Sequence, residues 1–121
     1  MKSIAVVEDN ADNRFLVQAL LEELYELREY EDGRSALAGL RENRPDLVLL
    51  DISLPGMDGL EVLREIRADE NLRELPVIAL TAHAMSGDRE RFLQAGFDDY
   101  LTKPILDEDL LHRIIADRLH A

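Results

Sequence analysis

Short, unbroken apolar runs alternate with segments of helical periodicity along the chain, and this alternation constrains the fold more than any other feature. The clearest apolar runs are residues 4–7, 47–50 and 77–80. Unbroken runs of this length are typical of parallel strands that helices cover on both faces. Two weaker runs, 27–31 and 97–101, mix charged with apolar residues, and we interpret them as edge strands of the same sheet.

Helical spacing fills the intervals between these runs. Leu16, Leu20 and Leu24 recur every four residues and predict one helix, which Asn10 or Asp12 is expected to cap. The other helical segments carry a polar residue in front or a glycine behind: they are expected after Asp32, after Asp58, before Gly96 and after Asp107.

The strand–helix repetition predicts an α/β fold with a doubly wound, five-stranded parallel sheet in a three-layer sandwich. The number of elements favours the flavodoxin-like strand order 2-1-3-4-5 with right-handed crossovers. A chain of 121 residues fits one domain. No linker, repeat or low-complexity segment interrupts it, so we expect a single domain over 1–121 with no output domain.

Charge and cysteine content exclude several classes of function. The formal net charge is −12, from 26 acidic and 14 basic residues, and this argues against binding to nucleic acid or to an anionic membrane. Because there are no cysteines, thiol catalysis and cysteine-ligated zinc are excluded. No apolar run approaches the ~18 residues of a membrane span, and the N-terminus lacks the features of a signal peptide. We therefore expect a cytoplasmic protein.

The candidate functional residues follow the predicted strands. Glu8 and Asp9 come after the first apolar run, Asp51 after the third strand, Thr81 after the fourth and Lys103 after the fifth. Ligands of open α/β sheets bind outside the carboxyl ends of the strands. We therefore expect three acids, a hydroxyl and an ammonium to converge at one edge of the sheet.

Three carboxylates held together repel one another unless a cation joins them, and Mg²⁺ is the hard cation that suits such oxygen ligands. A carboxylate beside Mg²⁺, here Asp51, can attack phosphorus and form an aspartyl phosphate. Simpler interpretations exist: Glu8 and Asp9 can merely begin a helix, and Asp51 can be a turn or cap residue. The first of these does not explain why Asp51, distant in sequence, also ends a strand.

Thr81 and Lys103 complete the predicted site. Thr81 offers a hydroxyl donor for a phosphoryl oxygen, although a lone threonine at a strand end commonly just bonds the backbone. The chain has only two lysines, Lys2 and Lys103, and its other basic residues are arginines. Lysine at this position indicates a need for a compact ammonium rather than a planar guanidinium. Pro104 follows, and a Lys–Pro bond can be cis.

Together these residues resemble the receiver domain of response regulators in two-component signalling, the CheY-like fold. The resemblance covers essentially the whole chain with the spacing intact. It rests on the acidic pair Glu8-Asp9, the phosphoacceptor Asp51 with its loop to Gly59, the switch threonine Thr81, the switch aromatic Tyr100, and Lys103-Pro104. The amino-acid sequence around Asn13 and over 82–104 is similar to that of stand-alone DivK-type receivers and of receivers in hybrid histidine kinases.

The resemblance implies a phosphorelay function. A histidine kinase or histidine phosphotransfer protein would donate a phosphoryl group to Asp51. Mg²⁺ would be bound by Asp9, Asp51 and the backbone carbonyl of Ser53, and by Glu8 through water. The chain would be a phosphoacceptor switch that catalyses its own phosphoryl transfer and dephosphorylation, rather than an enzyme acting on a separate substrate.

The resemblance also implies how the signal leaves the domain. Thr81 would move toward the phosphoryl group and Tyr100 would turn inward, which changes the surface offered to a downstream protein target. Ser53 and His83, each two residues beyond a site residue, are candidates for setting the lifetime of the phosphorylated state. For His83 the alternative is a solvated loop side chain.

Other functions fit the sequence less well. A haloacid-type phosphatase needs a second Asp where this chain has Ser53, and a nucleotide- or flavin-binding protein needs a glycine-rich phosphate loop where it has Glu8 and Asp9. A constitutive interaction module is disfavoured because every matched residue is present. A receiver excised from a hybrid kinase stays open, although the start at Met1 favours a stand-alone protein. We expect a monomer or weak dimer.

Overall fold

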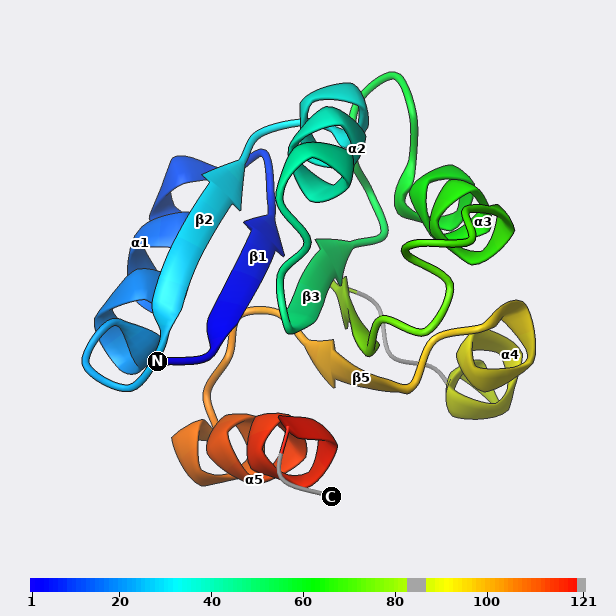
Figure 1. The fold of residues 1–121 in the computed structure, drawn as a ribbon. Helices are drawn as coiled ribbons and strands as arrows, with labels where there is room; N and C mark the ends of the chain where they lie inside the picture. The colour runs from blue at the N-terminus through cyan, green and yellow to red at the C-terminus, as the bar shows by residue number, and fades with distance from the viewer. Residues whose placement is uncertain (83–86, 120–121) are drawn as a thin grey trace.

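The computed structural model describes residues 1–82 and 87–119, and its centre is a parallel sheet of five strands in the order β2-β1-β3-β4-β5 (Figure 1). This confirms the predicted fold class and strand order, with the two weaker runs at the edges. The strands are β1 (Ser3–Val7), β2 (Glu26–Tyr30), β3 (Leu47–Asp51), β4 (Val77–Thr81) and β5 (Asp99–Thr102).

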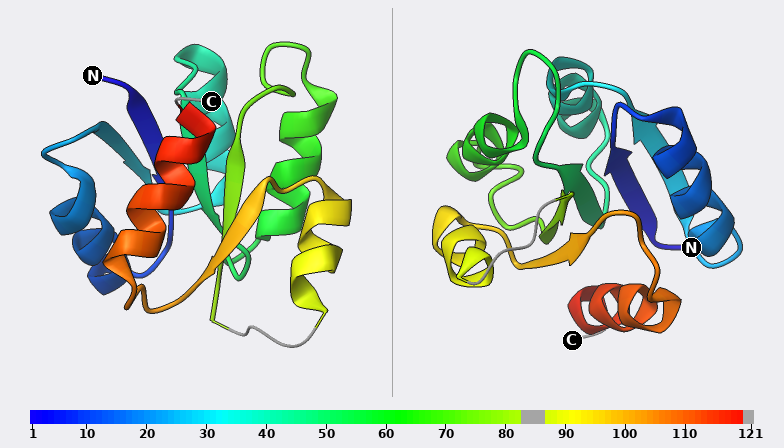
Figure 2. Two further views of the ribbon diagram at one scale, coloured as in Figure 1. Left: turned by 90° about the horizontal axis from the view of Figure 1, so that it is seen from below. Right: turned by 180° about the vertical axis from the view of Figure 1, so that it is seen from behind.

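Helices cover both faces of the sheet and complete the three layers (Figure 2). One face carries α1 (Ala11–Leu21) and α5 (Glu108–Leu119). The other carries α2 (Gly33–Glu42), α3 (Gly59–Ala68) and α4 (Asp88–Ala95). No helix within the described residues has both the length and the apolar character needed to cross a membrane.

The three central strands are buried along their whole length, which explains their unbroken apolar runs. Side chains alternate across a strand, so consecutive residues enter different cores. In β1, Ile4 and Val6 pack beneath α1 and α5, whereas Ala5 and Val7 pack beneath α2, α3 and α4. Both faces of a central strand must therefore be apolar.

Capping side chains set the N-termini of α1, α2, α3 and α5, the last of which is capped by Asp107. Asn10 Oδ1 accepts a hydrogen bond from the backbone N–H of Asn13 at 3.0 Å, so Asn10 rather than Asp12 caps α1. Asp32 and Asp58 cap α2 and α3 in the same way. Each cap satisfies a backbone donor that the helix leaves unpaired. The caps begin these helices just beyond the carboxyl ends of the preceding strands.

The predicted Leu16–Leu20–Leu24 stripe is wrong in its detail. The helix ends at Leu21, and Leu24 is 56% exposed in the turn that follows. The turn is closed by hydrogen bonds from the N–H groups of Leu24 and Tyr25 to the carbonyl of Leu21, both 3.0 Å long. Tyr25 enters the core in place of Leu24, because the turn redirects the chain into β2.

Candidate functional site

Three carboxylates meet at the carboxyl edge of the sheet, as the sequence predicted. Glu8 and Asp9 follow β1, and Asp51 is the last residue of β3. One carboxylate oxygen from each lies within 4.8 Å of the others. Glu8 is 0% exposed and Asp51 1% exposed, whereas Asp9 faces solvent. The site is thus a buried acidic pair with one acid at its mouth.

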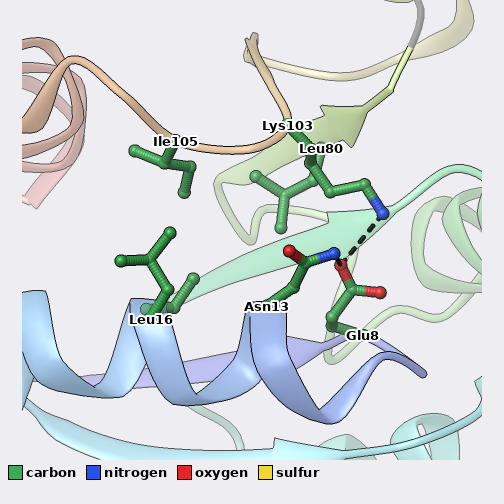
Figure 3. A pocket seen from close by; sticks show the side chains of 7 residues that line it. Glu8, Asn13, Leu16, Leu80, Lys103 and Ile105 are labelled. Carbon is green, nitrogen blue, oxygen red and sulfur yellow. Dashed lines mark hydrogen bonds and ion pairs between the residues drawn. The ribbon is translucent and has the colours of Figure 1, made fainter.

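Lys103 brings the positive charge of this site. Its Nζ lies 2.9 Å from Glu8 Oε1 and 3.0 Å from Asp51 Oδ2, and Figure 3 shows the contact with Glu8. The backbone N–H of Lys103 donates to the carbonyl of Thr81 at 2.7 Å, which ties the end of β5 to the end of β4. The Lys103–Pro104 peptide bond is cis.

The buried charges shift one another's pKa values. Burial, and after it the contact with Asp51, raise the pKa of Glu8 to about 7 against the opposing effect of Lys103. Burial also acts to raise the pKa of Asp51, but the contact with Glu8, the hydrogen bond from the Ser53 N–H and the Lys103 ammonium outweigh it and the pKa falls. For Lys103, burial is outweighed by the two acids, so its pKa rises. Asp51 is therefore held ionised beside a charged ammonium.

The two oxygens of Asp51 have different surroundings. Oδ1 accepts a hydrogen bond from the Ser53 backbone N–H at 3.0 Å. Oδ2 is buried beside the Lys103 ammonium, and no described residue offers it a well-directed hydrogen bond. A buried carboxylate oxygen without hydrogen bonds is costly unless a cation compensates it. With Asp9 nearby, this set of hard oxygen donors fits Mg²⁺.

The loop after Asp51 returns tightly to the strand end. The Gly59 N–H donates to the Ile52 carbonyl at 2.9 Å. A Cβ atom at Gly59 would overlap the carbonyl oxygen of Asp51, so only glycine lets α3 begin this close to the site. Gly56 adopts the left-handed conformation with φ of +74° within the same loop.

The other residues predicted from the sequence lie on different elements around the acids. Thr81 is buried at the end of β4, one residue beyond Leu80, which pairs with Asp51 in the sheet register. Ser53 is exposed. Tyr100 is half-buried with its ring centroid 5.8 Å from that of Phe92, and it lines a surface cavity of about 420 Å³ over β5 and α5. His83 lies outside the described residues.

Sequence reasoning assigned no role to two residues in the first turns of α1. Asn13 Nδ2 donates to Glu8 Oε1 at 3.1 Å, and Asn13 lines a small cavity beside the Glu8–Lys103 pair together with Leu16 and Ile105 (Figure 3). Arg14 Nη1 donates to the Glu8 backbone carbonyl at 2.8 Å. The available signal was their position, five and six residues beyond Glu8 on a capped helix.

Comparison with known proteins agrees with this geometry. Residues 4–115 match the family described as the response regulator receiver domain. The chain belongs to this family, and it is a receiver domain of the two-component response regulator class. It is similar to the polar-differentiation response regulator DivK of Brucella anthropi, with 49% identity over 105 residues, covering 86% of this chain and 85% of DivK.

Solved structures with the same fold include metal-bound receivers. The receiver domain of the sensor histidine kinase PA1611 from Pseudomonas aeruginosa, with a magnesium ion coordinated in its active-site cleft, is 43% identical with a TM-score of 0.89, covering 99% of this chain and 98% of that chain. The Mn²⁺-bound form of response regulator Rcp1 is 33% identical with a TM-score of 0.84, covering 100% and 96%. Similar receivers thus occur both in response regulators and in histidine kinases.

Proposed function

We propose that Asp51 accepts a phosphoryl group from a phosphohistidine on a histidine kinase or histidine phosphotransfer protein. The single observation that carries this proposal is the Asp51 carboxylate, ionised and buried, with the Lys103 ammonium 3.0 Å away and two further acids within metal-ligand reach. An Asp51 oxygen forms the new bond to phosphorus, and the phosphorus–nitrogen bond breaks. The imidazole nitrogen keeps the electron pair and takes up a proton.

The acidic residues divide the work of binding a metal in this proposal. Asp9, Asp51 and the backbone carbonyl of Ser53 would hold Mg²⁺, and Glu8 would hold it through water. When bound, the ion neutralises charge on the phosphoryl oxygens, which is the main contribution to such transfers. Support comes from the clustered oxygens here and from the magnesium in the PA1611 receiver.

Lys103 and Thr81 stabilise the phosphorylated form. The ammonium that pairs with Asp51 is placed to pair with a phosphoryl oxygen instead, and the Thr81 hydroxyl lies on the neighbouring strand end. Movement of Thr81 and Tyr100 would repack the surface of α4, β5 and α5, on which Tyr100 lies beside a cavity. This is a population shift toward a state that the phosphoryl group favours, and a downstream protein target reads it.

A surface beside the site suits the phosphodonor. Leu16 and Ile105 line one cavity next to Glu8, and their neighbours Phe15 and Leu106 are 71% and 88% exposed. Exposed apolar side chains that flank an active site are typical of protein interfaces. We place the donor protein over this rim, with its phosphohistidine directed at Asp51, and we place the protein in the cytoplasm with its donor.

Intact-mass measurement tests the proposal. The protein is incubated with Mg²⁺ and acetyl phosphate, and we expect the gain of one phosphoryl group. Asp51→Asn should gain none, whereas the matched control Asp117→Asn, on the exposed side of α5, should gain it as the wild type does. EDTA should suppress the gain. A wild type that gains no phosphoryl group, or an Asp51→Asn variant that gains as much, would refute the assignment.

A further inference from the structure

Arg14 makes two contacts that join the Glu8–Asp9 segment to the residue that follows β2. Its Nη1 donates to the backbone carbonyl of Glu8 at 2.8 Å, and its Nη2 lies 3.2 Å from Glu31 Oε1. The side chain is only 16% exposed. A partly buried arginine that bonds a main-chain oxygen of the site has a fixed geometry, because the guanidinium is a rigid planar fork.

We propose that Arg14 is a positioning residue for the metal-binding acids, acting as a clamp on the Glu8–Asp9 peptide group. This proposal rests on the proposed function, since it assumes that these acids bind Mg²⁺. Nothing in the sequence pattern of the acids themselves requires an arginine here. The contact arises because α1 begins at Ala11, so its first turns pass over the end of β1.

The carbonyl that Arg14 holds belongs to the peptide group joining Glu8 to Asp9. The two carboxylates extend from either side of this group, so its orientation sets both of them. The Glu8 N–H is already fixed by a 3.0 Å bond to the Tyr30 carbonyl, as part of the β1–β2 pairing. Arg14 fixes the next peptide group along the chain, beyond the reach of the sheet.

Glu31 completes the clamp from the end of β2. Its carboxylate, on a side chain that is 75% exposed, pairs with the second arm of the guanidinium, so that Arg14 spans the gap between the loop after β1 and the segment after β2. The Glu31 charge also offsets the positive charge that Arg14 would otherwise bring toward a cation site. Groups behind a ligand that orient it commonly contribute 10–100-fold to metal affinity.

Electrostatics alone and the clamp predict opposite results for Arg14→Gln. Removing a positive charge near a cation site should tighten Mg²⁺ binding if charge decides the outcome. If the clamp decides it, the dissociation constant for Mg²⁺ should rise about tenfold because the two carboxylates lose their shared orientation. Isothermal titration with MgCl₂ alone, without any phosphodonor, measures this constant directly.

The chain offers a matched control in Arg28. Its Nη1 donates to the Asn43 carbonyl at 2.7 Å, and its Nη2 lies 3.6 Å from Glu26 Oε1, so it also joins one backbone carbonyl to one glutamate. Arg28→Gln should leave the Mg²⁺ dissociation constant unchanged. Arg14→Lys keeps the charge but not the fork, and we expect about a fivefold rise.

A measurement on the metal-free protein separates the clamp from general destabilisation. The Asn10 N–H donates to Glu8 Oε2 at 3.3 Å. In EDTA, we expect amide hydrogen exchange at Asn10 to accelerate several-fold in Arg14→Gln and to match the wild type in Arg28→Gln. Unchanged Asn10 exchange, or an Mg²⁺ constant that is unchanged or lower in Arg14→Gln, overturns the proposal, as does full retention of affinity in Arg14→Lys.

The two proposals fail in different experiments. If Arg14→Gln binds Mg²⁺ as the wild type does while Asp51 still gains a phosphoryl group, the clamp is refuted and the phosphoacceptor stands. If Asp51 gains no phosphoryl group but Arg14→Gln weakens Mg²⁺ binding and loosens Asn10, the clamp stands and the proposed function is refuted.

Discussion

Two charged clusters lie at opposite edges of the same sheet, and they differ in how completely their charges are paired. At the amino-terminal edge, Arg67 of α3 directs its guanidinium at the carbonyls of several loops. It donates to Arg73, Leu75 and Gly96 at 2.7–3.1 Å, and to Asp98 Oδ2 at 3.1 Å. Asp98 Oδ2 also accepts the Val77 N–H at 2.8 Å.

The cluster at the carboxyl-terminal edge is left unbalanced. Glu8, Asp9 and Asp51 share one ammonium from Lys103, and Asp51 Oδ2 lacks a well-directed hydrogen bond. Around Arg67, by contrast, the single carboxylate of Asp98 is paired with both Arg67 and Arg118, and Arg67 also meets several neutral acceptors. The difference is that paired charges hold loops in place at one edge, whereas unpaired negative charge is retained at the other, the site for which we propose a cation and a phosphoryl group.

The largest effect on stability is expected at Arg67. Arg67→Gln removes bonds that join the end of α3 to the segments before β4 and β5, and leaves their carbonyl oxygens unpaired. We expect a loss of about 3 kcal/mol in the free energy of unfolding, measured by urea denaturation. Phosphoryl transfer per folded molecule should stay within twofold of the wild type. A large loss of phosphoryl transfer in Arg67→Gln that is fully folded would show that the two clusters are not separate in function.

Lys103→Met should have the opposite effect, with the main loss in phosphoryl transfer rather than in stability. We expect at least a 100-fold loss in the rate of phosphoryl transfer from acetyl phosphate, or about 2.7 kcal/mol in the barrier, because the buried acids lose their only nearby ammonium within the described residues. The control is Lys2→Met at the exposed N-terminus, which should transfer normally. A Lys103→Met variant that retains the wild-type rate would contradict the assigned role.

The pH dependence of stability should show how much the buried negative charge of Glu8 destabilises the folded protein. Because the pKa of Glu8 rises from 4.5 to about 7 on folding, the unfolded chain releases this proton at lower pH than the folded chain does. The Glu8 contribution therefore falls as the pH rises from about 4.5 to about 7 and is constant above.

Glu8→Gln removes this titration while keeping hydrogen-bonding capacity. In EDTA we expect the variant to exceed the wild type by about 2 kcal/mol at pH 8 and by little at pH 4.5. Urea denaturation at the two pH values measures the difference. Glu29→Gln, at an exposed position of β2, provides the control. A Glu8→Gln variant that is less stable than the wild type at pH 8 would contradict the expected direction of this stability difference.

The smallest effect is expected from the metal itself. Mg²⁺ at ten times its dissociation constant should stabilise the wild type by about 1.4 kcal/mol, because it binds the folded state only. Arg67→Gln should retain this gain and Asp51→Asn should lose most of it, as thermal unfolding with and without MgCl₂ would show. An equal gain in Asp51→Asn would place the ion elsewhere.

Sequence reasoning reached the fold because parallel strands buried on both faces leave an unbroken apolar signature. It reached Glu8 and Asp51 because each follows such a run, and Lys103 because it follows the weaker fifth run, since the carboxyl ends of parallel strands share an edge. It failed at Leu24, since a helical stripe does not reveal where a turn ends the helix. It also assigned no role to Arg14 or Arg67, whose acceptors are backbone carbonyls that carry no sequence signal.

The amino-acid sequence by itself therefore determined the layers, the strand order and the identity of the groups at the site. Periodicity and the alternation of strands and helices are local properties, and they are written in consecutive residues. Only the tertiary structure decided which oxygen each cation contacts, that Asn10 caps α1, and that Asp51 is ionised while Glu8 tends to hold a proton. Burial and distances of a few ångströms control these properties, and both depend on segments that are far apart in the chain.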